Sequence, residues 1–250
     1  MIADLQKASL LKRLSAYLLD MILLLIAATG IALLFATALD YDSYRETLNA
    51  AKTEYADQYD VNLDKDYSEM TAEEKERYDD ALEALNKDEK AMHAYGMMIS
   101  LILLISSLSI LLPYLLLEFF VPLLFRNGQT IGKKVFGIAL MRTDSVRISS
   151  VALFARTLLG KCTLETMVPV AIVLMILMGS LGIEGTLILL AFLVLQIGLL
   201  IATKTHSCIH DLMAGTVVVE LASQMIFDSE EAMLEYRKRL HSERVEQTKS

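Results

Sequence analysis

Cysteine, histidine and proline are scarce in this chain, which has 2, 4 and 3 of them among 250 residues. Cys162 and Cys208 lie near helix ends that are expected in the cytoplasm, where disulfides seldom persist, so both are predicted to be free thiols. His206, Cys208, His210 and Asp211 are close in sequence, but no second group of ligands accompanies them, and no metal is predicted. His210 and Asp211 are adjacent and point in different directions on any regular element. No catalytic set, enzyme activity or cofactor is therefore expected.

A concentrated basic surface is also missing. The formal net charge is −8, and the segment 40–92 alone holds 17 acidic and 7 basic residues. The acidic excess therefore belongs to this segment, and the rest of the chain is slightly basic. Because no part combines a dense basic face with interleaved aromatic residues, nucleic acid is excluded as a partner.

Long apolar runs are abundant, and 54% of the residues are hydrophobic. The longest runs cover 14–39, 95–125, 166–183 and 186–202. A helix needs about 20 apolar residues to cross the hydrocarbon core of a bilayer. The sequence predicts an all-α polytopic membrane helix bundle with about four transmembrane helices. Three spans are possible, because the last two runs are short and can instead form an interfacial or buried helix pair.

Lysine and arginine in short flanking segments indicate the orientation in the membrane. The N-terminal flank carries Lys7, Lys12 and Arg13. The loop after the second run is basic and carries Arg126, Lys133, Lys134, Arg142, Arg147, Arg156 and Lys161. We expect a multi-pass protein of the cell membrane with both termini in the cytoplasm.

The segment 40–93 contains neither proline nor glycine, which argues against a flexible linker. Its stretches 43–59 and 72–95 are rich in good helix formers, with Glu83 and Lys87 at i, i+4 spacing. Thr71 and Glu74 have the spacing of a capping box at the start of a helix. The segment is predicted to form an acidic extracytoplasmic helical hairpin.

The basic loop contains GQTIGKK at 128–134, which is similar to a phosphate-binding loop. Its glycines are too close together, and a second Lys stands where Ser or Thr would bind magnesium. Lys133, Lys134 and Arg156 are therefore assigned to lipid headgroups or to structural roles, with a buried partner as the alternative for Arg156. The segment 135–141 is expected to form a short strand or helix, and 148–162 an amphipathic interfacial helix.

The chain divides into six expected parts. They are the N-terminus and first span 1–39, the acidic hairpin 40–93, the second span 94–125, the basic loop and interfacial helix 126–162, a helical hairpin with a closing segment 163–219, and a charged cytoplasmic tail 220–250.

Two carboxylates interrupt the apolar runs. Asp20 lies seven residues after Arg13, and Glu118 lies eight residues before Arg126, which places both carboxylates about 10 to 12 Å from the same membrane side. Because a charge at that depth costs roughly 3 kcal/mol, such residues often mark ion or proton sites. We predict a cation or proton site at Asp20 and Glu118, with Tyr114 as a hydrogen-bond partner.

The same residues also fit a purely structural role. Arg13 can pair with Asp20, Glu118 or Asp211 only to hold helices together, because polar contacts favour one arrangement of a bundle over slipped ones. Asp211 lies nine residues beyond the last apolar run, near Lys204 and His206, so its position favours an exposed helix cap over a ligand.

The chain resembles the RDD family of membrane proteins in three segments: KRLSAYLLD at 12–20, GQTIGKKVFG at 128–137 and SCIHDLMAGTVVV at 207–219. The similarity covers nearly the whole chain except the acidic hairpin and the tail. The family is named for one Arg and two Asp, which the resemblance places at Arg13, Asp20 and Asp211. The resemblance adds Arg13 and Asp211 to the candidates for the ion or proton site. It implies a mostly bacterial protein with about three spans, for which transport, including sodium/proton exchange, is proposed in some members.

Two functions follow as hypotheses. The first is a secondary transporter that exchanges a small cation for protons through Asp20 and Glu118. A homodimer would then be expected, because one short bundle gives little protein to enclose a pathway. The alternative is a non-transporting scaffold or regulatory component that binds protein partners through the acidic hairpin and the tail.

Overall fold

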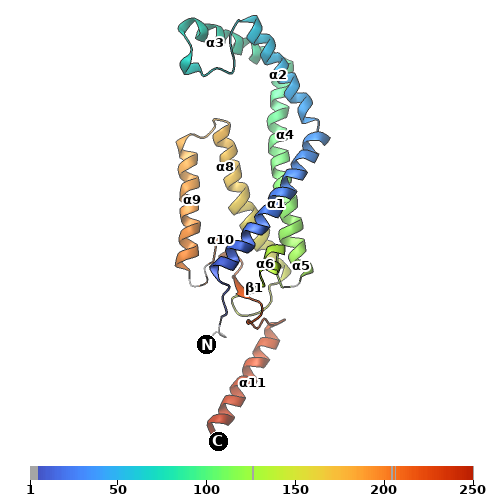
Figure 1. Cartoon of the computed structure of the whole chain (residues 1–250), viewed down its shortest axis with the longest axis vertical. Coiled ribbons are helices and arrows are strands. Elements are labelled where there is room, and N and C mark those ends of the chain that lie inside the picture. The colour runs from blue at the N-terminus through green and yellow to red at the C-terminus, as the bar shows by residue number, and fades with distance from the viewer. Residues whose placement is uncertain (1–4, 126, 204, 206, 250) are drawn as a thin grey trace. The chain divides into compact units, whose positions relative to one another are not determined.

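The computed structural model describes residues 5–125, 127–203, 205 and 207–249, so Arg126 and His206 lie outside the described residues. Within these ranges, four helices are long and apolar enough to cross a membrane: Leu10–Ala38, Glu89–Leu124, Ser150–Leu177 and Ile183–Ala202. Figure 1 shows them as the long ribbons of the chain. The prediction of an all-α, multi-pass membrane bundle is confirmed.

The third span differs from the prediction. Helix α7 (Ser150–Phe154), the π-helical segment η3 (Ala155–Met167) and helix α8 (Val168–Leu177) follow one another without a break. The junction residues Phe154 and Met167 have right-handed helical backbone angles, so the chain does not turn. The separate interfacial helix expected at 148–162 is therefore wrong. Its charged residues Arg156 and Lys161 are buried against partners within the protein, which removes the need for an interfacial position.

The chain forms two compact units, one of residues 29–109 and one of residues 1–28 with 110–250. Helices α1 (Leu10–Ala38) and α4 (Glu89–Pro113) have residues in both units.

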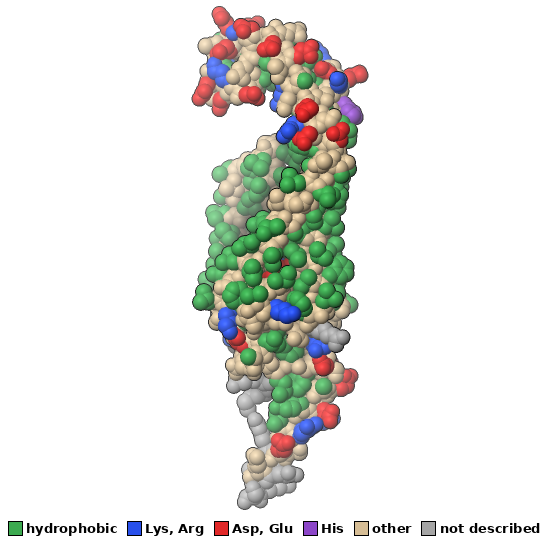
Figure 2. All heavy atoms as spheres, turned by 45° about the vertical axis from the view of Figure 1, so that its right-hand side comes forward, with side chains coloured by type: hydrophobic (Ala, Val, Ile, Leu, Met, Phe, Trp, Pro, Cys, Tyr) green, Lys and Arg blue, Asp and Glu red, His purple; other side chains and the backbone are tan. Residues whose placement is uncertain are grey.

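The unit 29–109 contains α2 (Tyr41–Gln58), the short 3₁₀ helix η1 (Tyr67–Glu69) and α3 (Ala72–Lys87). Helix α2 packs on α3, and Leu48 and Leu85 lie in the core between them. The expected capping box is present, because Thr71 Oγ1 accepts from the Glu74 N–H and Glu74 Oε2 accepts from the Thr71 N–H. Acidic side chains gather over this unit in Figure 2. The helices match the expectation, while their side of the membrane stays a prediction.

The second unit contains a short antiparallel strand pair. Strand β1 (Ile138–Arg142) lies along β2 (Thr216–Glu220), with Ile138 opposite Glu220. The first four residues of each strand are buried. The segment 135–141, expected as a strand or a helix, thus contributes a strand, whose partner lies about 80 residues further along the chain. Helices α6 (Ile131–Val135) and α10 (Ile209–Met213) directly precede the two strands.

The rest of this unit is helical. The π-helical segment η2 (Tyr114–Phe120) and helix α5 (Val121–Leu124) continue α4, and α11 (Glu230–Lys249) forms the tail. Helices α8 and α9 (Ile183–Ala202) lie side by side and are joined by a tight turn at Gly179, whose φ is +70°. Most of α9 is exposed and apolar, which suits contact with lipid.

Candidate functional site

The candidate site is built on two π-helical segments. Glu118 belongs to η2, whereas Arg156, Lys161 and Glu165 belong to η3. π-Helical turns are rare and are frequently found at functional sites. Here they bring four charged side chains inside helices that are otherwise apolar.

Pro122 explains one contact between these segments. In a regular helix, the residue at 122 would donate its N–H to the carbonyl of Glu118, but proline has no N–H. Thr157 Oγ1 donates to the Glu118 carbonyl instead, at 3.1 Å, and Thr157 is fully buried. Segments η2 and η3 are therefore joined where the helical hydrogen bond is missing.

Glu118 and Lys161 form a buried ion pair. Lys161 Nζ lies 2.5 Å from Glu118 Oε1, and the side chains are 8% and 1% exposed. The other oxygen, Glu118 Oε2, is buried and has no hydrogen-bond partner among the described residues. Burying a carboxylate oxygen without a donor is costly. This oxygen is therefore a buried acceptor that lacks a donor among the described residues.

Asp20 has different partners. Its Oδ2 accepts from Thr130 Oγ1 at 2.5 Å, and its Oδ1 accepts from the Gly132 N–H at 2.8 Å. A Cβ at position 132 would lie 2.2 Å from the Ala16 carbonyl oxygen, so only glycine permits this approach. Asp20 thus docks the start of α6 against α1. No described residue is hydrogen-bonded to both Asp20 and Glu118, although the sequence predicted that they share a site.

Tyr114 also differs from the expectation that it contacts Glu118. Its hydroxyl lies 2.7 Å from Thr166 Oγ1, and Thr166 Oγ1 lies 3.0 Å from the Lys161 carbonyl. Since the threonine hydroxyl has one proton and gives it to that carbonyl, the tyrosine hydroxyl is the donor to Thr166.

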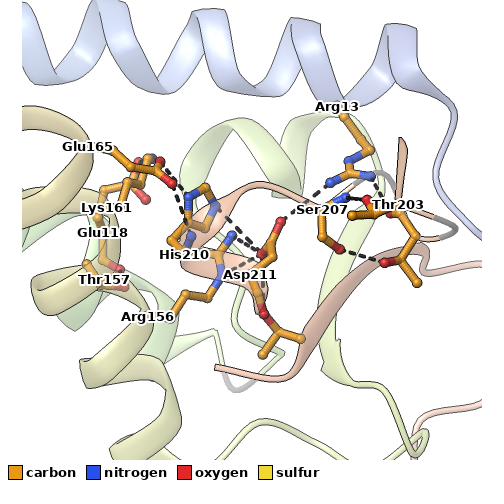
Figure 3. A network of polar contacts seen from close by, with 12 residues as sticks. Arg13, Glu118, Arg156, Thr157, Lys161, Glu165, Thr203, Ser207, His210 and Asp211 are labelled. Atoms are coloured by element: carbon orange, nitrogen blue, oxygen red, sulfur yellow. Dashed lines mark hydrogen bonds and ion pairs between the residues drawn. The ribbon is translucent and has the colours of Figure 1, made fainter. Parts of the chain in front are cut away.

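Asp211 lies at the centre of a second buried group, drawn in Figure 3. Its Oδ1 accepts from Arg156 Nε at 2.9 Å and lies 2.8 Å from Arg156 Nη2. Arg13 Nη2 lies 3.6 Å from Oδ2, and Arg13 Nη1 donates to the Thr205 carbonyl. Asp211 is only 1% exposed. The interpretation of Asp211 as an exposed cap is therefore wrong, because two guanidinium groups replace the water that a cap would need.

The electrostatics of Asp211 follow from these contacts. Burial would by itself raise the pKa of the Asp211 carboxyl. The attraction of Arg156, with smaller contributions from His210 and Arg13, outweighs burial and holds this pKa well below its usual range. Asp211 is therefore ionised at neutral pH, and it holds the buried Arg156 and the partly exposed Arg13.

His210 connects Asp211 to Glu165. The backbone N–H of His210 donates to Glu165 Oε1 at 3.0 Å, and the ring nitrogen Nδ1 of His210 lies 2.6 Å from Glu165 Oε2. Gly160 makes this approach of α10 to η3 possible, because a Cβ there would lie 2.6 Å from the His210 Cβ. Figure 3 shows Glu165, His210 and Asp211 in one chain of contacts.

Of the three basic residues assigned to headgroups or structural roles, Lys133 and Arg156 are buried and Lys134 is exposed. Lys133 is 8% exposed, and burial is the main cause that lowers its pKa to about 8. Arg156 is 3% exposed and bound to Asp211. Burial favours a structural role for both. Lys134 is exposed, with its ammonium 3.7 Å from the centre of the Phe125 ring.

Both cysteines are free, as predicted. Burial is the largest cause that raises the pKa of the Cys208 thiol to about 11, so this thiol is protonated at neutral pH. In the part of the chain that is described, no group of three His, Cys, Asp or Glu side chains is arranged to hold a metal. His206, part of the sequence cluster considered for metal, lies outside that part.

Lys161, Glu165 and His210 are site residues that were not predicted from the sequence. Lys161 and Glu165 are spaced i, i+4 next to an apolar run, and such spacing was a signal that their segment is helical. The expectation of an interfacial helix at 148–162 assigned Lys161 to the membrane surface, and Glu165 lies just beyond that helix. No local pattern indicates the contact between Glu165 and His210, which are 45 residues apart.

These features define a multi-pass membrane protein with buried ion pairs between apolar helices. The family model of the RDD family matches residues 7–215, and the chain belongs to the RDD family. The comparisons with curated proteins and with solved structures give no match. Arg13, Asp20 and Asp211, selected by resemblance, are all placed within buried polar contacts.

Proposed function

We propose that the protein is a secondary transporter that exchanges a small cation for protons across the cell membrane. The observation that supports this proposal best is the buried Glu118–Lys161 pair, whose Glu118 Oε2 has no partner among the described residues. Intramembrane ionisable residues of this kind commonly serve ion or proton pathways.

The pair suggests how the exchange is coupled. A carboxylate among apolar helices needs one positive charge nearby, and Lys161 supplies it in this structure. In the proposed exchange, an entering cation pairs with Glu118 Oε2, the oxygen that Lys161 does not contact. Lys161 then loses its proton, so the site keeps the same net charge. Exchange by this route is one cation for one proton and does not depend on the membrane potential.

The other predicted site residues support this site in the proposal. Asp20 holds the start of α6 through Thr130 and Gly132, and Asp211 joins Arg13 to Arg156. The proposal keeps both termini in the cytoplasm, because short basic flanks of membrane spans usually lie on the cytoplasmic side. A homodimer is part of it, since one bundle of this size encloses little space.

Everted vesicles test the proposal. An imposed pH gradient is dissipated by added cations in vesicles with the wild type, and we expect Glu118→Gln and Lys161→Met to lose this response. Glu83→Gln and Lys87→Met are matched controls, because they change an exposed Glu–Lys pair of α3. Responses of Glu118→Gln equal to those of the wild type, at equal protein amounts, would refute the role of this carboxylate.

A second candidate is a non-transporting scaffold or regulatory component that binds protein partners. The observation in its favour is that each carboxylate of the candidate site (Asp20, Glu118, Glu165 and Asp211) has at least one donor or cation as partner. Such pairing serves stability as well as transport. If the wild type, present in verified amounts, exchanges no cation in the vesicle experiment, this second function is favoured.

A further inference from the structure

The ammonium group of Lys161 is surrounded by more than a carboxylate. Its Nζ lies 5.7 Å from the centre of the Tyr17 ring and 5.8 Å from that of Tyr114, in addition to the 2.5 Å contact with Glu118. A cation within about 6 Å of a ring centre is attracted by the electrons of the ring face. Two rings and one carboxylate together form the kind of surroundings in which proteins bind ammonium ligands.

The position of one ring is fixed. Tyr114 is only 4% exposed, and its hydroxyl is bound by Thr166, which in turn donates to the Lys161 carbonyl. The same helical segment therefore carries both the lysine and the threonine that holds the ring. Tyr17 comes from α1 and is about half exposed.

A cavity lies beside this group. Its volume is about 90 Å³, and its lining is apolar except for two hydroxyls, those of Tyr114 and Thr166. The residues that line it are Met21, Leu24, Leu25, Ala28, Ile110, Pro113, Tyr114 and Thr166. An apolar hollow of this kind suits a small apolar group. A hydrated inorganic ion finds no ligands in it, whereas an alkyl group does.

We propose that Glu118, Tyr17 and Tyr114 form a binding site for a small organic ammonium ion. Glu118 and the two rings bind the charged head, and the neighbouring cavity accepts one alkyl group. The inference rests on the proposed exchange function and names the class of its substrate. The side chain of Lys161 occupies the head position in this structure.

The exchange step leaves the net charge of the site unchanged. One N–H bond of the Lys161 ammonium breaks, the proton passes to water, and the electron pair stays on the nitrogen as a neutral amine. The Glu118 carboxylate then pairs with the entering ammonium ion. One positive charge has left the site as a proton and one has arrived with the substrate.

Tetramethylammonium is the probe that tests the inference. It carries no proton, so it cannot dissipate a pH gradient by crossing the membrane as a neutral base. In vesicles with the wild type, we expect tetramethylammonium to act at a concentration about tenfold lower than Na⁺ or K⁺, because a desolvated contact with aromatic rings changes affinity by about that factor.

Variants identify the site. Tyr17→Leu and Tyr114→Leu should each remove most of the preference for tetramethylammonium, and Tyr114→Phe, which keeps the ring face, should restore most of it. Tyr78→Leu in α3 is the matched control. Because Tyr17 is half exposed, its variant tests the site even if Tyr114→Leu does not fold.

The outcomes separate the two proposals. If Na⁺ or K⁺ drives exchange and tetramethylammonium does not, the inference is wrong and the exchange function stands. A preference that survives both leucine variants also overturns the inference. If no cation drives exchange in the wild type, the exchange function fails and the inference fails with it.

Discussion

Two Glu–Lys pairs of this protein have nearly the same length and opposite surroundings. In α3, Lys87 Nζ lies 2.6 Å from Glu83 Oε1, with the side chains 73% and 67% exposed. Between η3 and η2, Lys161 and Glu118 are 2.5 Å apart with 8% and 1% exposed. Water screens the first pair, whereas loss of one partner of the second leaves a charge without water. Burial, rather than distance, decides what such a pair does.

The largest effect of burial on the free energy of unfolding is expected at Asp211. In Asp211→Asn, Arg156 and Arg13 lose the carboxylate that they share. We expect a loss of about 3–5 kcal/mol in the free energy of unfolding, the usual cost of leaving a buried charge unpaired. Denaturation of the purified protein in detergent measures it. Asp228→Asn, which removes a 78% exposed partner of Arg147, is the control, and an equal loss in both would contradict the importance of burial.

A double-mutant cycle compares the two Glu–Lys pairs directly. We expect Glu118→Gln to destabilise the protein by roughly 3 kcal/mol, because Lys161 stays buried, and Lys161→Met to offset part of that loss when added. The coupling between Glu83 and Lys87 should be close to zero. Unfolding of the four variants of each pair gives both coupling energies. Equal coupling energies in the two pairs would show that η2 and η3 move until the charge left behind reaches water.

The sequence predicted the elements of this fold better than its contacts. Long apolar runs, and the spacing of Thr71 and Glu74, are local signals. The four membrane-spanning helices and the capping box are confirmed, although the third helix begins earlier than predicted. The π-helical segments, and the continuity of residues 150–177, depend on contacts such as the hydrogen bond from Thr157 to the Glu118 carbonyl. A local pattern contains no information about such a partner.

The candidate site shows the same division. Asp20, Glu118 and Arg13 were recognised because a charge near an apolar run is conspicuous. Their partners were not, since Thr130 is 110 residues from Asp20 and Lys161 is 43 residues from Glu118. The pairing of Arg13 with Asp211 was one of three alternatives in the sequence, and only the fold selects among them.

Glycine substitutions compare a tightly packed position with an open one. In Gly132→Ala, the new Cβ would meet the Ala16 carbonyl and Asp20, and we expect a loss of about 1–3 kcal/mol from overpacking. Gly30→Ala is the control, because nothing lies within 4 Å of a Cβ there and alanine favours a helix by roughly 0.5–1 kcal/mol. Thermal unfolding measures both. A destabilisation by Gly30→Ala as large as that by Gly132→Ala would contradict the close approach of α6 to α1.

The smallest effect is expected in the unit 29–109, at the exposed capping box of α3. The Thr71 backbone N–H, and then Lys65, stabilise the carboxylate of Glu74 and lower its pKa from 4.5 to about 2. A lowered pKa in the folded state means that the stabilisation is complete above about pH 4.5 and is lost as the pH falls towards 2. Thr71→Ala should remove about 1 kcal/mol of local stability.

Hydrogen exchange of the amides in residues 72–87 tests this contribution, with each rate divided by its intrinsic rate at the same pH. Protection should fall as the pH drops from about 4.5 towards 2 in the wild type, and it should change less in Glu74→Gln, which has no carboxylate to protonate. Glu83→Gln serves as the control, since Glu83 lies on the same helix and outside the capping box. If Glu74→Gln keeps the full pH dependence, another acid controls this helix, and the local cap is not what stabilises its start.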